Sequence, residues 1–215
     1  YHYRKVNEKP LAIETQHARL GIIWGFFRWL HRQGYLLCNP AASLELPKLP
    51  AQLPRRVLDV SQVERVMCQP DLGTARGIRD RAILETLYST GIRRQELVRL
   101  KLEHIDLHKG TVMVRKGKGG KDRMVPIGER ALAWIDRYLQ EVRSSLVKEP
   151  DDGTLFLSRT GHAMTPGYLT TVVTKHLAAA ELAKGGSCHL FRHTAATLML
   201  EHGADTRYIQ EMLGH

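Results

Sequence analysis

The sequence is poor in cysteine and has no long apolar run. Its three cysteines, Cys38, Cys68 and Cys188, lie far apart and form no C-x-x-C pair. This pattern argues against a disulfide framework or a cysteine zinc site and fits a reducing cytoplasm. No apolar run approaches the ~18 residues that a membrane span needs, and no charged-then-apolar leader opens the chain. We therefore expect a cytoplasmic protein rather than a membrane or secreted one.

Negative charge is scarce relative to positive charge. Lys and Arg number 32 and Asp and Glu number 22, so the formal net charge is +10 over 215 residues. Clustered cations gain affinity for a polyanion by releasing its condensed counterions. The imbalance favours a nucleic-acid partner, although composition alone leaves a merely basic globular protein open. The 43% of apolar residues is typical of globular chains.

Apolar periodicity divides the chain into two predicted units. Residues 15–34 have the spacing of one amphipathic helix, with Arg28 and Arg32 away from its apolar face. A stretch with prolines at 47, 50 and 54 follows and is typical of an extended linker. We place the linker at residues 51–58, between a first unit at 1–50 and a second at 59–215.

The second unit combines helices with one β-hairpin. Ser61 and Glu64 have the spacing of a capping box, and Thr165-Pro166 has the pattern of another helix start. Further helices are expected over residues 74–90, 130–147, 189–202 and 205–213. The alternation of Val112 and Val114, followed after a glycine-rich turn by residues 124–127, predicts an antiparallel hairpin. The expected fold class is mainly α with a small antiparallel β-sheet.

Five positions carry side chains suited to phosphodiester chemistry: Arg93, Lys118, His189, Arg192 and His215. Arginines can bind non-bridging phosphate oxygens bidentately and neutralise developing charge. A lysine can protonate a departing sugar oxygen, and a histidine can move the nucleophile's proton. Taken singly, each position also has an ordinary interpretation, such as a solvated basic hairpin or a surface ion pair between Arg93 and Glu96. Such a site needs no metal, and the sequence has no carboxylate cluster to hold one, so we expect no cofactor.

Two histidines four residues apart also suggest zinc. A metalloprotease helix would hold a glutamate between them, whereas here Arg192 would place a cation beside the metal. A metal-dependent phosphodiesterase built on His189, His193 and His215 is kept as a third, less favoured hypothesis.

Four motifs occur in series: T-G-I-R-R-Q-E-L, G-K-G-G-K-D-R-M-V-P-I, H-L-F-R-H and G-A-D-T-R-Y-I-Q-E-M-L-G-H. Together they resemble the tyrosine recombinase (phage integrase) family, and most of all its Xer-type bacterial members, over roughly residues 15–215. The resemblance implies a partial helical core-binding domain at 1–50 and a mixed α/β catalytic domain at 59–215. It also implies that the two domains close around double-stranded DNA and that the complete protein acts as a tetramer on DNA.

The same resemblance assigns roles to the site residues. Arg93 and Arg192 would bind the scissile phosphate, and Lys118 would be the general acid. His189 would assist proton transfer, His215 would hydrogen-bond the phosphate, and Glu96 would hold the first arginine. His193 is expected to be structural. The predicted DNA-contacting residues are Arg28, Arg32, Arg94, Lys116, Lys121 and Arg123.

One feature departs from the family pattern. The family's nucleophile is a tyrosine a little over two helical turns beyond the last histidine, and the sequence ends at His215. Tyr208 precedes that histidine, and its neighbours Ile209 and Leu213 indicate a packing role. We expect a fragment, truncated at both ends, of a site-specific DNA recombinase that uses a 3′-phosphotyrosyl intermediate. The fragment would be inactive alone, and the alternative is a catalytically inactive DNA-binding remnant of a mobile-element integrase.

Overall fold

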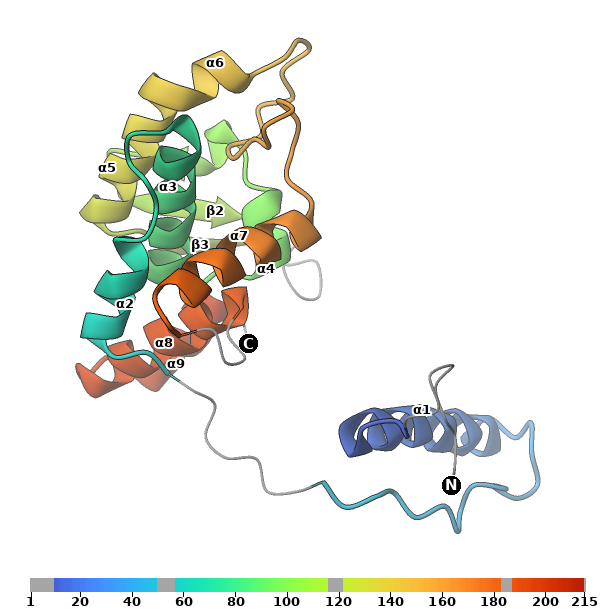
Figure 1. Ribbon diagram of the computed structural model, residues 1–215. Helices are drawn as coiled ribbons and strands as arrows, with labels where there is room; N and C mark the ends of the chain where they lie inside the picture. The colour runs from blue at the N-terminus through green and yellow to red at the C-terminus, as the bar shows by residue number, and fades with distance from the viewer. Residues whose placement is uncertain (1–9, 50–56, 116–121, 183–186, 215) are drawn as a thin grey trace. The chain divides into compact units, whose positions relative to one another are not determined.

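The computed structural model describes residues 10–49, 57–115, 122–182 and 187–214 (Figure 1). The chain forms two compact units, Tyr1–Arg55 and Arg56–His215. The division falls inside the predicted linker range 51–58, most of which lies outside the described residues. None of the helices in the described part of the chain is long and apolar enough to cross a membrane.

The first unit contains helix α1 (Ile13–Arg32), which begins and ends two residues before the predicted positions. Gly34, with φ of +76°, ends it in a Schellman motif: the N–H of Gly34 bonds to His31 O and that of Tyr35 to Leu30 O. No residue of α1 is fully buried. The chain after α1 returns alongside it, because His17 Nδ1 lies 2.8 Å from Pro47 O.

The second unit is built around helix α3 (Ala75–Thr90), which packs against helices on either side and against the sheet (Figure 1). The predicted start and stop of this helix are confirmed. Thr74 accepts a hydrogen bond from Gly77 N, and Gly91 ends the helix with φ of +57°. The side chains of α3 are buried nearly all round, charged ones included. Asp80, for example, lies 2.8 Å from Arg79 and 3.0 Å from His176.

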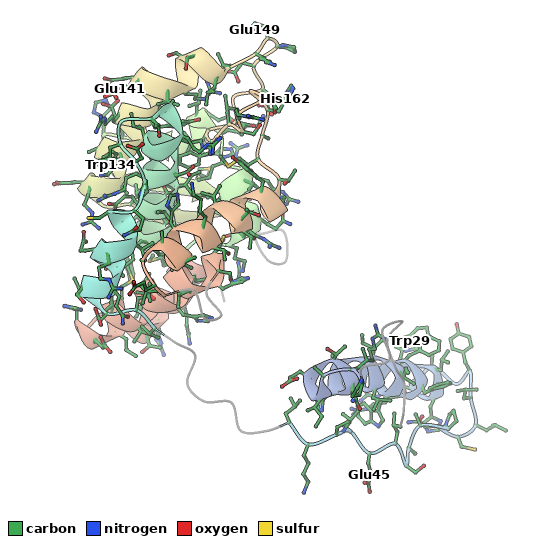
Figure 2. All side chains as sticks on the ribbon, in the orientation of Figure 1. Trp29, Glu45, Trp134, Glu141, Glu149 and His162 are labelled. Atoms are coloured by element: carbon green, nitrogen blue, oxygen red, sulfur yellow. The ribbon has the colours of Figure 1, made fainter. Side chains whose placement is uncertain are left out.

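The other helices surround α3. They are α2 (Val60–Met67), α4 (Arg94–Val98), α5 (Glu129–Tyr138), α6 (Ser144–Leu146), α7 (Pro166–Ala179), α8 (Cys188–Glu201) and α9 (Thr206–Leu213), with a short 3₁₀-helix η1 (Leu102–His104). The predicted helix start at Thr165-Pro166 is confirmed, because Thr165 Oγ1 accepts from Tyr168 N. On α5, Trp134 lies 4.9 Å from the Arg81 guanidinium and 5.3 Å from that of Arg137 (Figure 2).

Two helix predictions are wrong in detail. Helix α2 is capped by Asp59 and Gln62, not by Ser61 and Glu64. The carboxylate of Asp59 accepts from Gln62 N and from Ser61 Oγ, so the serine hydroxyl is a donor within the cap. The predicted helix 130–147 is interrupted by a π-helical turn, η3 (Leu139–Arg143).

Along α5 and the π-helical turn, Ala131, Ile135, Tyr138 and Val142 are buried, whereas Leu132 and Leu139 are only partly buried. Arg143 is buried too, and its guanidinium donates to Thr154 O and to the Asp151 carboxylate.

The sheet has three antiparallel strands in the order β1 (Ile105–Asp106), β2 (Thr111–Val114) and β3 (Arg123–Pro126). The predicted hairpin is confirmed, with Val112 opposite Val125 and Val114 opposite Arg123. Strand β1 was not predicted, because two residues are too few for an alternation to show. The expected fold class, mainly α with a small antiparallel sheet, is confirmed.

Candidate phosphate-binding site

The first predicted arginine lies where α3 turns into α4. Gly91 adopts the left-handed conformation that a side chain would make costly, so the chain reverses sharply there. Arg93 is the residue immediately before α4, and its backbone N–H donates to Glu96 Oε2 at 2.8 Å. Its Nη1 donates to Glu96 Oε1 at 3.0 Å, so the predicted pairing of these two residues is present.

Glu96 is shared between two arginines. Arg123, at the start of β3, donates from Nη1 to Oε1 at 2.9 Å and from Nη2 to Oε2 at 2.8 Å. With the two bonds from Arg93, the carboxylate accepts four hydrogen bonds, which is its full capacity. Burial would raise the pKa of Glu96, but these hydrogen bonds and the nearby positive charges outweigh it and lower the pKa to about 2.

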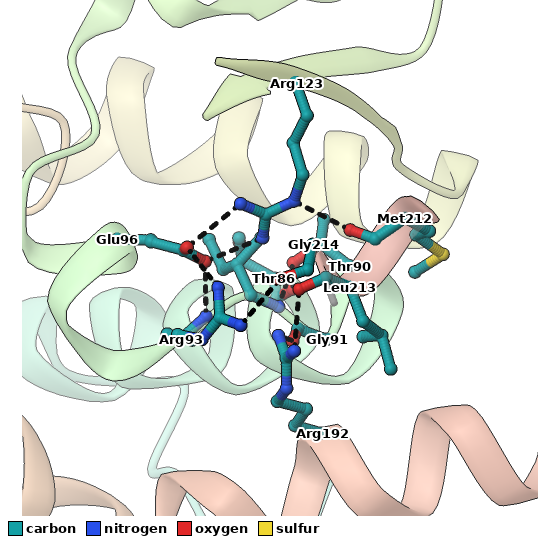
Figure 3. Close-up of polar contacts among 11 residues, drawn as sticks. Thr86, Thr90, Gly91, Arg93, Glu96, Arg123, Arg192, Met212, Leu213 and Gly214 are labelled. Carbon is teal, nitrogen blue, oxygen red and sulfur yellow. Dashed lines mark hydrogen bonds and ion pairs between the residues drawn. The ribbon is translucent and has the colours of Figure 1, made fainter. Parts of the chain in front are cut away.

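Three arginines converge on the last turn of α9 (Figure 3). The consecutive carbonyls of Met212, Leu213 and Gly214 accept hydrogen bonds from Arg123 Nε at 2.8 Å, Arg192 Nη2 at 2.7 Å and Arg93 Nη2 at 3.0 Å, respectively. Carbonyls at a helix C-terminus lack intrahelical partners and carry partial negative charge. The three guanidinium groups therefore gather around one electronegative helix end, although they come from separate parts of the sequence.

Arg192 is the most deeply buried of the three arginines, with 6% of its surface exposed. It lies on α8, and its Nη1 also donates to Gly91 O at 2.8 Å. Burial, assisted by the charge of Arg93, lowers the pKa of Arg192 to about 10, so the group stays cationic at neutral pH. Arg192 thus connects the end of α3 to the end of α9.

Two glycines allow this convergence. A Cβ on Gly91 would lie 2.9 Å from Leu213 Cδ2, closer than real Cβ contacts. Gly214 has φ of +70°, and a Cβ there would lie 3.2 Å from three atoms of the Arg123 guanidinium. The flat face of that guanidinium can approach the backbone because position 214 has no side chain.

The remaining predicted residues are placed as follows. His189 is exposed in the first turn of α8, one helical turn from Arg192 and on the same side of the helix. Arg94 donates to Thr170 Oγ1 of α7 at 2.9 Å. Arg28 and Arg32 are exposed on α1 in the first unit. The predictions for Lys116, Lys118, Lys121 and His215 fall outside the described residues.

The described residues contain no group of three or more His, Cys, Asp and Glu side chains placed to hold a metal ion. The zinc hypothesis includes His215, which lies outside that part of the chain.

Sequence reasoning placed Arg123 among the DNA contacts and missed its contact with Glu96. The strand pattern carried a signal for it. Successive side chains of a strand alternate between two faces, so Arg123 shares the face of Val125, which is fully buried. A charged residue in phase with a buried one indicates a cation that pairs within the protein. Whether Arg123 also touches DNA stays a prediction.

The fold and the site together define a class: a tyrosine-recombinase-like catalytic unit in which arginines from separate motifs meet beside a β-hairpin. Residues 56–215 match the model of the phage integrase family, and the chain belongs to that family. Tyrosine recombinase XerC 2 of Ralstonia nicotianae is 46% identical over 215 residues, which are 100% of this chain and 62% of that protein. The chain therefore spans about three fifths of the length of this curated relative.

Solved structures agree with this assignment. XerA recombinase matches with a TM-score of 0.68 and 28% identity, over 95% of this chain and 68% of that chain. XerH site-specific recombinase bound to its difH substrate, in a pre-cleavage complex, matches with a TM-score of 0.65 and 27% identity. That match covers 80% of this chain and 50% of the other.

Proposed function

We propose that this chain is part of a site-specific DNA recombinase that breaks and rejoins DNA strands through a 3′-phosphotyrosyl intermediate without a metal ion. The observation that carries the proposal is the meeting of Arg93 and Arg192, from two motifs 99 positions apart in the sequence, at the last turn of α9. Two guanidinium groups beside one another suit the non-bridging oxygens of a single phosphate.

The electrostatics of the cluster favour an anion. Arg93, Arg123 and Arg192 supply three positive charges, and the carboxylate of Glu96 supplies one negative charge. The sum is 3 − 1 = +2, in a site where burial weakens screening by water. Such a charge would stabilise the extra negative charge that develops on a phosphate during attack.

The remaining steps are assigned through the family. A tyrosine of the complete protein would attack the phosphorus, the 5′-oxygen would leave, and Lys118 would protonate it. His189 would assist proton transfer from the nucleophile, and His215 would hydrogen-bond the phosphate. The proposed partner is double-stranded DNA, bound by a tetramer of the complete protein. The relatives named above include a recombinase solved on its substrate, which supports this partner.

The test is covalent attachment to DNA by the full-length gene product. Duplexes that the protein binds are first selected from a random pool. A nick is then placed within the selected DNA sequence, so that a cleaved strand is trapped, and the protein and DNA are incubated in EDTA. A protein–DNA adduct on a denaturing gel is expected. Arg93→Ala and Arg192→Ala should each form it at least roughly a hundredfold more slowly.

The control for the loss of one charge is Arg137→Ala, because the named contacts of Arg137 are an ion pair with Glu141 and a ring contact with Trp134, and neither partner belongs to the candidate site. Its adduct rate should match that of the unaltered protein. Residues 1–215 alone should bind duplex DNA and form no adduct. If the full-length product binds but never reacts, the catalytically inactive DNA-binding alternative is correct. An adduct that requires Mg²⁺ would refute the metal-independent step.

A further inference from the structure

The guanidinium of Arg123 is bonded on two sides by the protein. Both Nη atoms donate to the Glu96 carboxylate, and Nε donates to Met212 O at 2.8 Å. Only 11% of the side chain is exposed, and the group lies against the backbone of Gly214. The charge of Arg123 is paired directly with a carboxylate and is directed to α4 and α9, whereas the named hydrogen-bond partners of Arg192 are the neutral carbonyls of Gly91 and Leu213.

The negative charge of Glu96 opposes the positive charge of Arg93, and Arg123 offsets that negative charge. Glu96 accepts one hydrogen bond from the Arg93 backbone and one from its guanidinium, which it thereby orients, but a carboxylate 3.0 Å from a guanidinium also cancels its charge. The Arg93–Glu96 pair alone would be neutral. A second guanidinium on the same carboxylate leaves the group of three with a net charge of +1, while the orienting bonds stay in place.

We propose that Arg123 is a positioning residue of the phosphate site, which compensates Glu96 so that Arg93 is oriented by the carboxylate yet keeps its charge for the phosphate. Its bond to Met212 O holds the end of α9 in the same arrangement. This inference rests on the proposed function, since it concerns the same site.

The first experiment separates this role from DNA contact. In the full-length gene product, Arg123→Ala should slow adduct formation at saturating DNA by roughly ten- to a hundredfold, the equivalent of one or two charge-assisted hydrogen bonds. The affinity for duplex DNA and its salt dependence should match those of Arg137→Ala. A DNA contact would give the opposite result: weaker binding, a salt slope smaller by about one unit, and an unchanged rate at saturation.

The second experiment tests the compensation itself. Glu96→Gln keeps the shape of the side chain and removes its charge, so the double variant Arg123→Ala/Glu96→Gln has no carboxylate to cancel Arg93. It should react about tenfold faster than Arg123→Ala alone. A purely structural role for Arg123 predicts that the double variant reacts no faster than Arg123→Ala, because removing the carboxylate restores none of the contacts that Arg123 made with Glu96 and Met212. A double variant that reacts no faster than Arg123→Ala would therefore overturn the proposal.

A substrate with an uncharged scissile position gives an independent readout. Replacing a non-bridging oxygen with a methyl group removes charge that the arginines otherwise neutralise. The defect of Arg123→Ala should shrink on this methylphosphonate substrate, as should that of Arg93→Ala. If the defect is the same on both substrates, Arg123 does not act through the charge of Arg93.

Two controls keep the outcome clear. If the alanine variant does not fold, as judged by its thermal unfolding curve, Arg123→Gln carries the same expectations with less lost packing. If the unaltered protein forms no adduct, the proposed function fails. If it does and Arg123→Ala reacts at the same rate, only the assignment of Arg123 fails.

Discussion

At the scale of single residues, Glu96 shows how one buried carboxylate can organise several cations. Its side chain is 6% exposed, and such a group would be costly to bury without partners. Four hydrogen bonds from Arg93 and Arg123 satisfy it. The carboxylate therefore contributes to stability only while it is ionised, and this makes its role measurable by pH.

We expect Glu96→Gln to destabilise the chain in a pH-dependent way. The folded protein lowers the pKa of Glu96 from 4.5 to about 2, so its stabilisation is present above about pH 4.5 and is lost as the pH falls toward 2. The shift corresponds to at most about 3 kcal/mol. Urea unfolding of residues 1–215 and of the variant should give a free-energy difference that is largest near pH 7 and shrinks below pH 4.5.

A control substitution removes the general effect of acid. Glu141→Gln changes an exposed carboxylate paired with Arg137 by an i,i+4 contact, which is worth only a few tenths of a kcal/mol. Its free-energy difference should stay small at every pH. If Glu96→Gln behaves the same way, the carboxylate does not hold the two arginines together in solution.

At the scale of elements, the site depends on how closely the end of α9 approaches the end of α3. Gly91 and Gly214 both take positive φ, and in both places a Cβ would collide with or press on the opposing group. The backbone of Gly91 thus lies against the Leu213 side chain, and Arg192 joins Gly91 O to Leu213 O. A substitution at these glycines tests packing and conformation together.

Gly91→Ala and Gly203→Ala form a matched pair. Both glycines have positive φ, at +57° and +84°, but a Cβ on Gly203 meets nothing within 4 Å, while one on Gly91 lies 2.9 Å from Leu213 Cδ2. Gly203→Ala should cost about 1 kcal/mol, for the left-handed backbone alone. Gly91→Ala should cost about 2–4 kcal/mol, because overpacking is added. Equal losses in urea unfolding would show that α9 does not pack tightly on α3.

Most elements could be predicted because their signals are local. Thr74 and Gly91 define α3, and the alternation around Val112 defines the hairpin, since caps and periodicity are written in neighbouring residues. The cap of helix α2 was predicted incorrectly, because Asp59 and Ser61 are both good capping residues at close positions. The two-residue strand β1 carries too little pattern to be seen.

The residues of the site could be predicted from the sequence better than the hydrogen bonds between them. Arg93 and Glu96 lie three residues apart, so their pairing follows from helix geometry. The bonds of Arg123 to Glu96 and Met212 span 27 and 89 residues, respectively. Such contacts depend on how β3, α4 and α9 pack, and nothing local in the sequence specifies that packing.

At the scale of the whole molecule, much of the charge of the second unit is neutralised within it. Glu64 and Glu85 pair with Arg130, and Asp151 pairs with Arg143. The net excess of +10 must therefore lie in cations beyond these pairs, including the exposed Arg28 and Arg32 of α1. These are the groups available to a polyanion outside the phosphate site.

We expect residues 1–215 to bind duplex DNA with a steep dependence on salt. Each cation that neutralises a phosphate contributes about −0.9 to the slope of log affinity against log salt concentration, so a slope of several negative units is expected. Fluorescence anisotropy on a labelled duplex between about 50 and 200 mM salt measures this slope.

Arg28→Ala and Arg32→Ala should each make the slope shallower by about one unit, because their side chains are exposed. Arg123→Ala should leave the slope unchanged, because its guanidinium is bonded to Glu96 and Met212. A slope near zero for the unaltered chain would show that its positive charge does not contribute to DNA binding. If Arg123→Ala alone makes the slope shallower, Arg123 contacts DNA after all.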